Sequence, residues 1–122
     1  MGQRFIKQGP GWRIGWNEES VTYKGLVGSD DWAIELTETE FRDFCRLVLQ
    51  LGETMELMQA ELMDEETITC EVQSDLIWLE VVGFPSAYSL RLLVEQGRRC
   101  EGNWQESAVK AMTAAIQVFN GF

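Results

Sequence analysis

The sequence predicts an α+β fold in which two β-β-β-β-α units form one domain over residues 1–122. Apolar and polar residues alternate along short segments, as in strands with one buried face, and two segments carry apolar residues at spacings of three and four, as in helices. The second helical segment also repeats the apolar positions of the first, so that Leu36 aligns with Trp104 and Phe41 with Val109. This repeat divides the chain into units 4–63 and 67–120.

Four short strands are expected before the first helix. Residues 4–8 form a short segment that ends at a Gly-Pro-Gly turn signal. Residues 12–17 and 21–27 then alternate between apolar and polar side chains, and residues 32–36 lead into the first helix. Three tryptophans of the chain occupy apolar positions and are expected in the core: Trp12, Trp16 and Trp104.

The first helix has clear start and stop signals. Thr37 and Glu40 form a capping box, in which each side chain accepts a hydrogen bond from a backbone donor that the helix leaves unpaired. Apolar residues then recur past Gly52 to Leu62, which predicts one helix of about 25 residues although a glycine inside a helix costs about 1 kcal/mol. The acidic residues 64–66 are expected to end it, because negative charge is unfavourable at a helix C-terminus.

The second unit repeats this order. Strands are expected over residues 67–73, 76–82, 88–94 and 98–103, and a helix over about 105–118. The nearly continuous apolar run of 76–82 is typical of a central strand that is covered on both faces. Because short turns connect antiparallel strands, we expect a curved antiparallel sheet with both helices on its concave face.

The composition limits the function. The net charge is -10 and the chain contains no histidine, the commonest general base and metal ligand, so we expect no enzyme, metal or cofactor. The cysteines Cys45, Cys70 and Cys100 are widely spaced, which predicts reduced thiols. No apolar run reaches the roughly 18 residues of a membrane span, and the N-terminal residues lack a secretory signal. We therefore expect a soluble, cytoplasmic protein.

Several stretches resemble known families. Tyr23-Lys24-Gly25, within the order of two β-β-β-β-α units, is similar to the start of the Lys-Gly-Lys-Ala-Ala-Leu stretch of the Whirly-type single-stranded-DNA-binding regulators, and the likeness ends at Leu26. In length, in Gly11-Trp12-Arg13 and in Trp78-Leu79-Glu80, the chain resembles a small uncharacterised cyanobacterial family. The first resemblance implies a Whirly-like fold, which the positive-cofactor class of coactivators builds from two chains; a cystatin-like fold is the alternative.

Basic side chains are the candidates for nucleic-acid contact. Those on the solvent face of the predicted sheet and at its last hairpin could follow the phosphates of a single strand, while exposed aromatic rings stack on bases. The competing interpretation is that they are ordinary solvated residues among twice as many acidic ones. The candidates are Arg13, Lys24, Arg91, Arg98 and Arg99.

The candidates for protein contact lie on the first helix and on one strand. A helix of about 25 residues is about 37 Å long, whereas short strands span about 17–20 Å, so part of its methionine-rich stripe should extend beyond the sheet. Trp78 shares a strand face with Glu80 and should be partly exposed. The candidates are Met55, Met58, Met63 and Trp78.

Two hypotheses for the function follow from these features. The first is a non-enzymatic cytoplasmic binding or adaptor domain that acts through a protein partner or through self-association, such as dimer formation. The acidic charge and the exposed apolar candidates favour it. The alternative is a divergent transcriptional regulator that binds single-stranded nucleic acid on an open sheet face. Its main difficulty is the net charge of -10, which repels phosphate.

Overall fold

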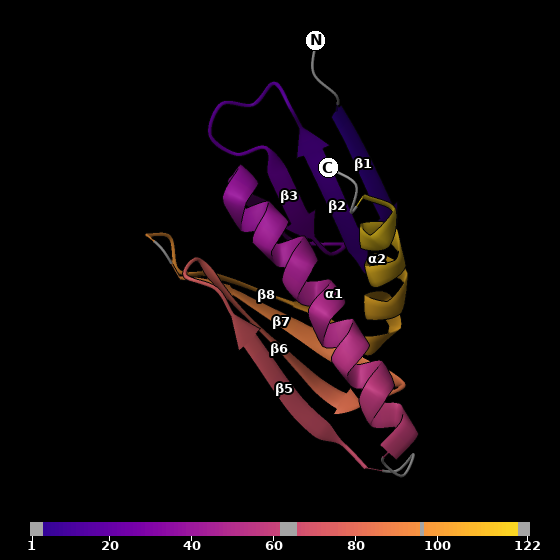
Figure 1. The fold of residues 1–122 in the computed structure, drawn as a ribbon. Helices are drawn as coiled ribbons and strands as arrows, with labels where there is room; N and C mark the ends of the chain where they lie inside the picture. Colours follow the sequence, from indigo (N-terminus) through magenta and orange to yellow (C-terminus); the bar gives the residue numbers. More distant parts are fainter. Residues whose placement is uncertain (1–3, 62–65, 96, 120–122) are drawn as a thin grey trace.

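The computed structural model describes residues 4–61, 66–95 and 97–119, and within them it confirms two successive β-β-β-β-α units. Figure 1 shows the arrangement of these elements. The first unit comprises β1 (Arg4–Gly9), β2 (Trp12–Asn17), β3 (Gly25–Gly28), β4 (Ala33–Leu36) and α1 (Glu38–Glu61). The second comprises β5 (Ile68–Gln73), β6 (Ile77–Phe84), β7 (Ala87–Val94), β8 (Cys100–Trp104) and α2 (Glu106–Phe119).

The strands form two antiparallel sheets, so the predicted α+β class is confirmed. Sheet A has the order β1-β2-β3-β4 and sheet B has the order β5-β6-β7-β8. Each strand pairs with its neighbour in sequence, as expected for strands that short turns connect. The described strands therefore divide into two sheets of four, where the sequence predicted a single curved one.

Side chains join the two sheets between β4 and β8. The indole N–H of Trp104 donates a hydrogen bond to the carbonyl oxygen of Gly28 at 2.8 Å, and both groups are buried. The ring of Trp32 lies 4.9 Å from that of Trp104 and packs directly on the backbone of Gly102, where a Cβ atom would come within 2.1 Å of it. An aromatic layer thus occupies the junction where a continuous sheet would need backbone hydrogen bonds.

Both helices cover parts of both sheets. The helix α1 begins against β3 and β4 and continues over β5 and β6, while α2 packs on β7 and also on β1 and β2 (Figure 1). The predicted capping box starts α1: the Thr37 N–H donates to Glu40 Oε1 at 2.9 Å, and the Glu40 N–H donates to Thr37 Oγ1 at 3.2 Å. Neither helix in the described ranges is long and apolar enough to cross a membrane.

One hydrophobic core lies between the helices and the inner faces of the two sheets. It contains Trp12, Trp16 and Trp104, each at most 8% exposed, which confirms their predicted burial. The stripe of α1 continues this core from Phe41 to Met55. Because the two sheets lie one after the other beneath α1, the helix finds apolar partners over most of its length.

Candidate protein-contact surface

The outer face of sheet B has no helix over it in the described part of the chain (Figure 1). Along β6, Ile77, Leu79 and Val81 are buried, whereas Trp78 is half-buried and Val82 is exposed. The expectation that residues 76–82 are covered on both faces is therefore corrected. Both helices lie on the same side of sheet B, so only the inner set of side chains reaches the core.

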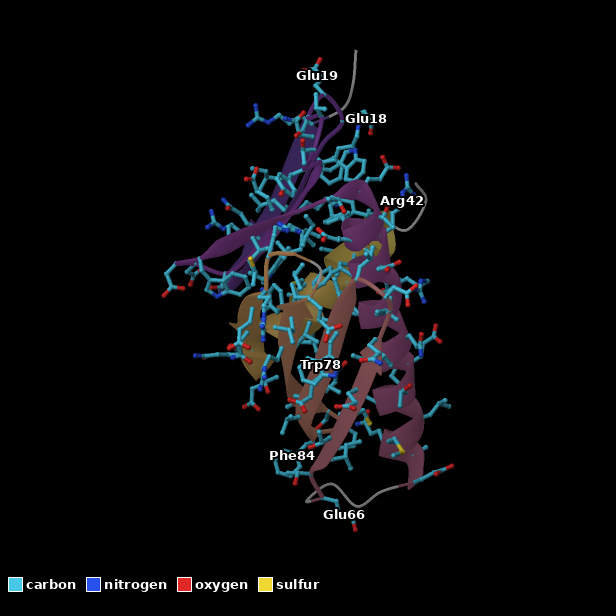
Figure 2. The ribbon with its side chains drawn as sticks, turned by 90° about the vertical axis from the view of Figure 1, so that its left-hand side faces the viewer. Glu18, Glu19, Arg42, Glu66, Trp78 and Phe84 are labelled. Atoms are coloured by element: carbon cyan, nitrogen blue, oxygen red, sulfur yellow. The ribbon has the colours of Figure 1, made fainter. Side chains whose placement is uncertain are left out.

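The strand register places four apolar side chains on this outer face. Trp78 pairs with Leu93 of β7, and Val82 and Phe84 lie on the same face of β6 beyond Glu80. Val82 is 43% exposed and Phe84 is 36% exposed. Figure 2 looks at this side of the molecule and shows Trp78 and Phe84 along the length of sheet B. We call Trp78, Val82, Phe84 and Leu93 the apolar ridge.

Charged side chains border the apolar ridge. Glu71 of β5 pairs with Glu80 of β6, which pairs in turn with Arg91 of β7, so all three share the outer face. The Arg91 guanidinium lies 5.2 Å from the centre of the Trp78 ring and 3.7 Å from a carboxylate oxygen of Glu101. Three carboxylates and one guanidinium thus lie beside and between the ridge residues, and together they carry a net negative charge.

The five basic candidates for nucleic-acid contact do not form one group. Arg13 lies on β2 and Lys24 precedes β3, so both belong to the part of the chain that forms sheet A. Arg91 lies on the outer face of sheet B, and Arg98 and Arg99 lie in the connection between β7 and β8. The structure therefore divides these side chains between two sheets and one turn.

The candidates near sheet A make contacts within the chain. Arg13 is half-buried, and its Nη2 donates to the carbonyl oxygen of Trp32 at 3.2 Å. The ammonium of Lys24 donates to the carbonyl oxygen of Glu18 at 2.8 Å and lies 3.5 Å from its carboxylate. The neighbouring Gly25 has a structural role, because a Cβ atom there would come within 2.5 Å of the Phe41 ring. Close packing of α1 accounts for this glycine.

Arg98 and Arg99 differ although they are adjacent. Arg98 donates hydrogen bonds to the Glu40 carboxylate and to the carbonyl oxygen of Glu35, and its guanidinium lies 4.7 Å from the centre of the Tyr23 ring. Arg99 is exposed and has a φ of 51°, a backbone conformation that is uncommon for a residue other than glycine. Arg98 therefore links elements of the fold, whereas Arg99 is exposed to solvent.

The methionine candidates for protein contact are not a common surface. Met55 is fully buried, so it belongs to the core and not to a contact surface. The reason is that sheet B supports this part of α1, where a single short sheet would have left it uncovered. Met58 is half-buried, next to the 72% exposed Leu57, and Met63 lies outside the described residues. Among the described candidates for protein contact, which also include Trp78, only Trp78 lies on an open sheet face.

Titratable groups add little to this surface. Burial raises the pKa of the Cys45 thiol to about 12, which keeps it protonated and unreactive. The Trp16 indole N–H donates to Glu18 at 2.8 Å and, with help from Lys24, lowers the pKa of that carboxyl. Among residues 4–61, 66–95 and 97–119, no cluster of three or more Cys, Asp or Glu side chains could hold a metal ion.

Sequence reasoning identified Trp78 but missed the rest of the surface. The missed residues are Val82, Phe84 and Leu93 of the ridge, and Glu71 and Glu101 beside it. A signal was present in the sequence: Leu93 follows Ser89 and Arg91 on the polar side of β7, where an apolar residue is unexpected. Only the register shows that Leu93 lies beside Trp78.

Comparisons with known proteins support the fold and leave the function open. A family model described as a domain of unknown function, DUF1818, matches residues 7–119. The chain is also similar to a protein of unknown function from the DUF155 family of Prochlorococcus sp. NATL2A, whose crystal structure has a TM-score of 0.89 and 27% sequence identity over 94% of this chain and 98% of that chain. No curated protein matches the sequence. An uncharacterised family, as the sequence predicted, is therefore confirmed.

Proposed function

Since this chain belongs to the DUF1818 family, which is described as a domain of unknown function, we propose its function from its own surface. We infer that it is a non-enzymatic cytoplasmic binding domain, and that it contacts a protein partner through the outer face of sheet B. The observation that carries this proposal is the apolar ridge, which stands on an uncovered sheet face between carboxylates.

The apolar ridge supports protein contact on energetic grounds. Soluble proteins seldom expose several large apolar side chains on one open sheet face, and exposed apolar surface among polar residues marks binding sites. Covering exposed apolar surface gains about 25 cal/mol per Å². Tryptophan is also among the residues that contribute most to protein interfaces. Trp78 would therefore be the main anchor, with Leu93 beside it on the next strand.

The charges around the apolar ridge define the partner. Glu71, Glu80 and Glu101 would attract lysine and arginine side chains, and the net charge of -10 would speed the encounter with a basic protein. A second copy of this chain, docked through the same face, would bring carboxylates toward carboxylates. A basic protein with an apolar centre to its interface is thus favoured over self-association.

Two features support binding over catalysis. The chain contains no histidine, and the Cys45 thiol, with its pKa raised to about 12, is a poor nucleophile. The carboxylates beside the ridge lie on an open face, where water is free to enter and electrostatic catalysis is weak. These groups are suited to steering and holding a charged partner.

A capture experiment with variants of the ridge tests this proposal. Immobilised wild-type protein should retain a defined set of basic proteins, and that set should be lost with Trp78→Ala combined with Leu93→Ala. The matched control is Ile6→Ala on sheet A, because Ile6 is 58% exposed on a different sheet. Capture should weaken between about 0.05 and 0.5 M salt, since salt screens charge interactions. Thermal unfolding confirms that each variant is folded.

Identical protein sets for the wild type and the ridge variant would contradict the proposal. So would a set that Ile6→Ala removes equally, because the effect would then not belong to sheet B. A set dominated by acidic proteins would refute the predicted chemistry of the partner.

One observation favours the alternative of a single-stranded nucleic-acid-binding regulator. Arg91 and Trp78 lie together on an open sheet face, and stacking of bases on such a pair is a common way of holding a single strand. This hypothesis predicts binding of a mixed oligonucleotide pool that weakens with salt and is lost in a Lys24→Ala, Arg91→Ala double variant. Absence of binding at low salt would exclude it.

A further inference from the structure

A groove with a volume of about 630 Å³ lies between α1 and α2 and reaches Pro85 and Tyr88 beside the turn that joins β6 to β7. The volume lies within the range of about 300–1,000 Å³ that is typical of small-molecule sites. One wall carries Glu53 and Glu56 of α1, and the other carries Lys110 of α2. None of the ridge residues lines it, so the groove is a separate surface from the proposed partner site.

The side chain of Tyr88 contributes a hydroxyl to the lining of this groove. Tyr88 is only 8% exposed, and its hydroxyl has no hydrogen-bond partner among the residues that the structure describes. Burial and the negative charge of Glu56 raise the pKa of this hydroxyl, so it stays protonated and can donate as well as accept. A hydroxyl that lines the groove without a protein partner can donate to or accept from a polar group of a ligand.

Gly52 keeps the space beside this hydroxyl open. It lies in the interior of α1, where glycine is less favourable than alanine. A Cβ atom there would lie 3.7 Å from Thr113 Cγ2 and 3.8 Å from the Tyr88 hydroxyl oxygen, which are ordinary contact distances. Close packing of the helices therefore does not require a glycine. Its effect is to leave the groove one methyl group deeper next to Tyr88.

Charges of opposite sign stand on the two walls without pairing. Glu53 and Glu56 form no ion pair with Lys110, and none of the three has another ion-pair partner within the described ranges. A ligand that carries both a positive and a negative group could pair with both walls at once. A purely anionic ligand would meet two carboxylates, and a purely cationic one would meet the ammonium.

We propose that this groove binds a small zwitterion of the amino-acid class. Its ammonium group faces Glu53 and Glu56, and its carboxylate faces Lys110. A polar atom of the ligand pairs with the Tyr88 hydroxyl in the space that Gly52 leaves open. This site does not depend on the partner surface of sheet B.

Binding of defined probes to the full chain tests the proposal. Each of the common L-amino acids is titrated into the protein by calorimetry, alongside its N-acetyl derivative, which lacks the ammonium, and its amide, which lacks the carboxylate. At least one free amino acid should bind, and both derivatives should bind about tenfold more weakly or not at all. Equal binding of a free amino acid and its derivatives, or no binding by any of them, overturns the proposal.

Variants then locate the site. Tyr88→Phe removes only the hydroxyl, and its matched control is Tyr23→Phe, which removes the other tyrosine hydroxyl of the chain. Gly52→Ala should raise the midpoint of thermal unfolding while lowering the association constant at least about tenfold, two opposite changes that general damage cannot produce. Trp78→Ala should bind the amino acid with the same association constant as the wild type. Unchanged binding by Gly52→Ala and Tyr88→Phe, or an equal loss in Tyr23→Phe, refutes the assignment.

Discussion

The guanidinium of Arg98 donates to the carboxylate of Glu40, 58 residues earlier in the chain. The same carboxylate oxygen accepts the N–H of Thr37, so one oxygen both closes the capping box of α1 and holds the β7–β8 connection. Glu40 is 4% exposed, and Arg98 is the described cation paired with it. This pair ties the turn of one repeat to the first helix of the other.

Replacement of Arg98 should therefore be costly. Arg98→Ala leaves the Glu40 carboxylate buried without a counter-charge, and we expect the free energy of unfolding to fall by about 3 kcal/mol. Arg99→Ala is the matched control: Arg99 is exposed, and its removal should change the free energy by less than about 0.5 kcal/mol. Urea denaturation followed by tryptophan fluorescence measures both. Equal effects would show that the pair with Glu40 contributes little.

The cap of α1 can be tested separately. Thr37→Ala removes the hydroxyl that accepts the Glu40 N–H at 3.2 Å, and it should destabilise the protein by about 1 kcal/mol. Thr39→Ala, two positions later and exposed, removes the same atoms without a capping bond and should be nearly neutral. A neutral Thr37→Ala in the same denaturation assay would contradict the cap.

The junction between the sheets depends on the indole of Trp104. Trp104→Phe keeps an aromatic ring but removes the donor to the Gly28 carbonyl at 2.8 Å and leaves part of the ring volume empty. We expect a loss of about 2–3 kcal/mol from these two effects together. Trp78→Phe on the open face should cost less than about 1 kcal/mol. Comparable losses for both would mean that the junction bond is unimportant.

The stability at high pH should depend on Cys45. The unfolded thiol loses its proton near its ordinary pKa of 9.0, whereas burial keeps the folded thiol protonated up to about 12. Between these values ionisation stabilises the unfolded state and not the folded state. The free energy of unfolding therefore falls as the pH rises, by up to about 1.4 kcal/mol per pH unit. Cys45→Ala should lack this part of the slope in denaturation measurements from pH 8 to pH 11. If the free energy of unfolding of the wild type and of Cys45→Ala fell in parallel with pH, this role of Cys45 would be refuted.

Local features of the fold were predictable from the sequence because they depend on neighbouring residues. The capping box of Thr37 and Glu40 and the alternation along β2 and β7 specify elements almost without reference to the rest of the chain. The division into two sheets was not predictable in this way. It depends on the packing of Trp32 against Gly102, two residues far apart in sequence, and alternation does not say which strand edges meet.

In the candidate surface, too, local features were predictable from the sequence and long-range contacts were not. Trp78 was predicted to be partly exposed because Glu80 shares its strand face, a local pattern. Met55 was placed wrongly on a surface because the length of α1 was compared with one sheet, whereas two sheets lie beneath it. The internal use of Arg98 depends on Glu40, and no local spacing reveals that pair.

The way in which each helix covers both sheets has a consequence for synthesis of the chain on the ribosome. When β1–β4 and α1 have emerged, the C-terminal half of α1 still lacks β5 and β6, the strands it packs on (Figure 1). The part of sheet A under α2 is likewise uncovered until α2 itself is made. A nascent first half would therefore expose the side chains around Leu51 and Met55 to the surrounding cell. Stable folding of either repeat has to wait for the other, because the one shared core closes only when α2 has emerged.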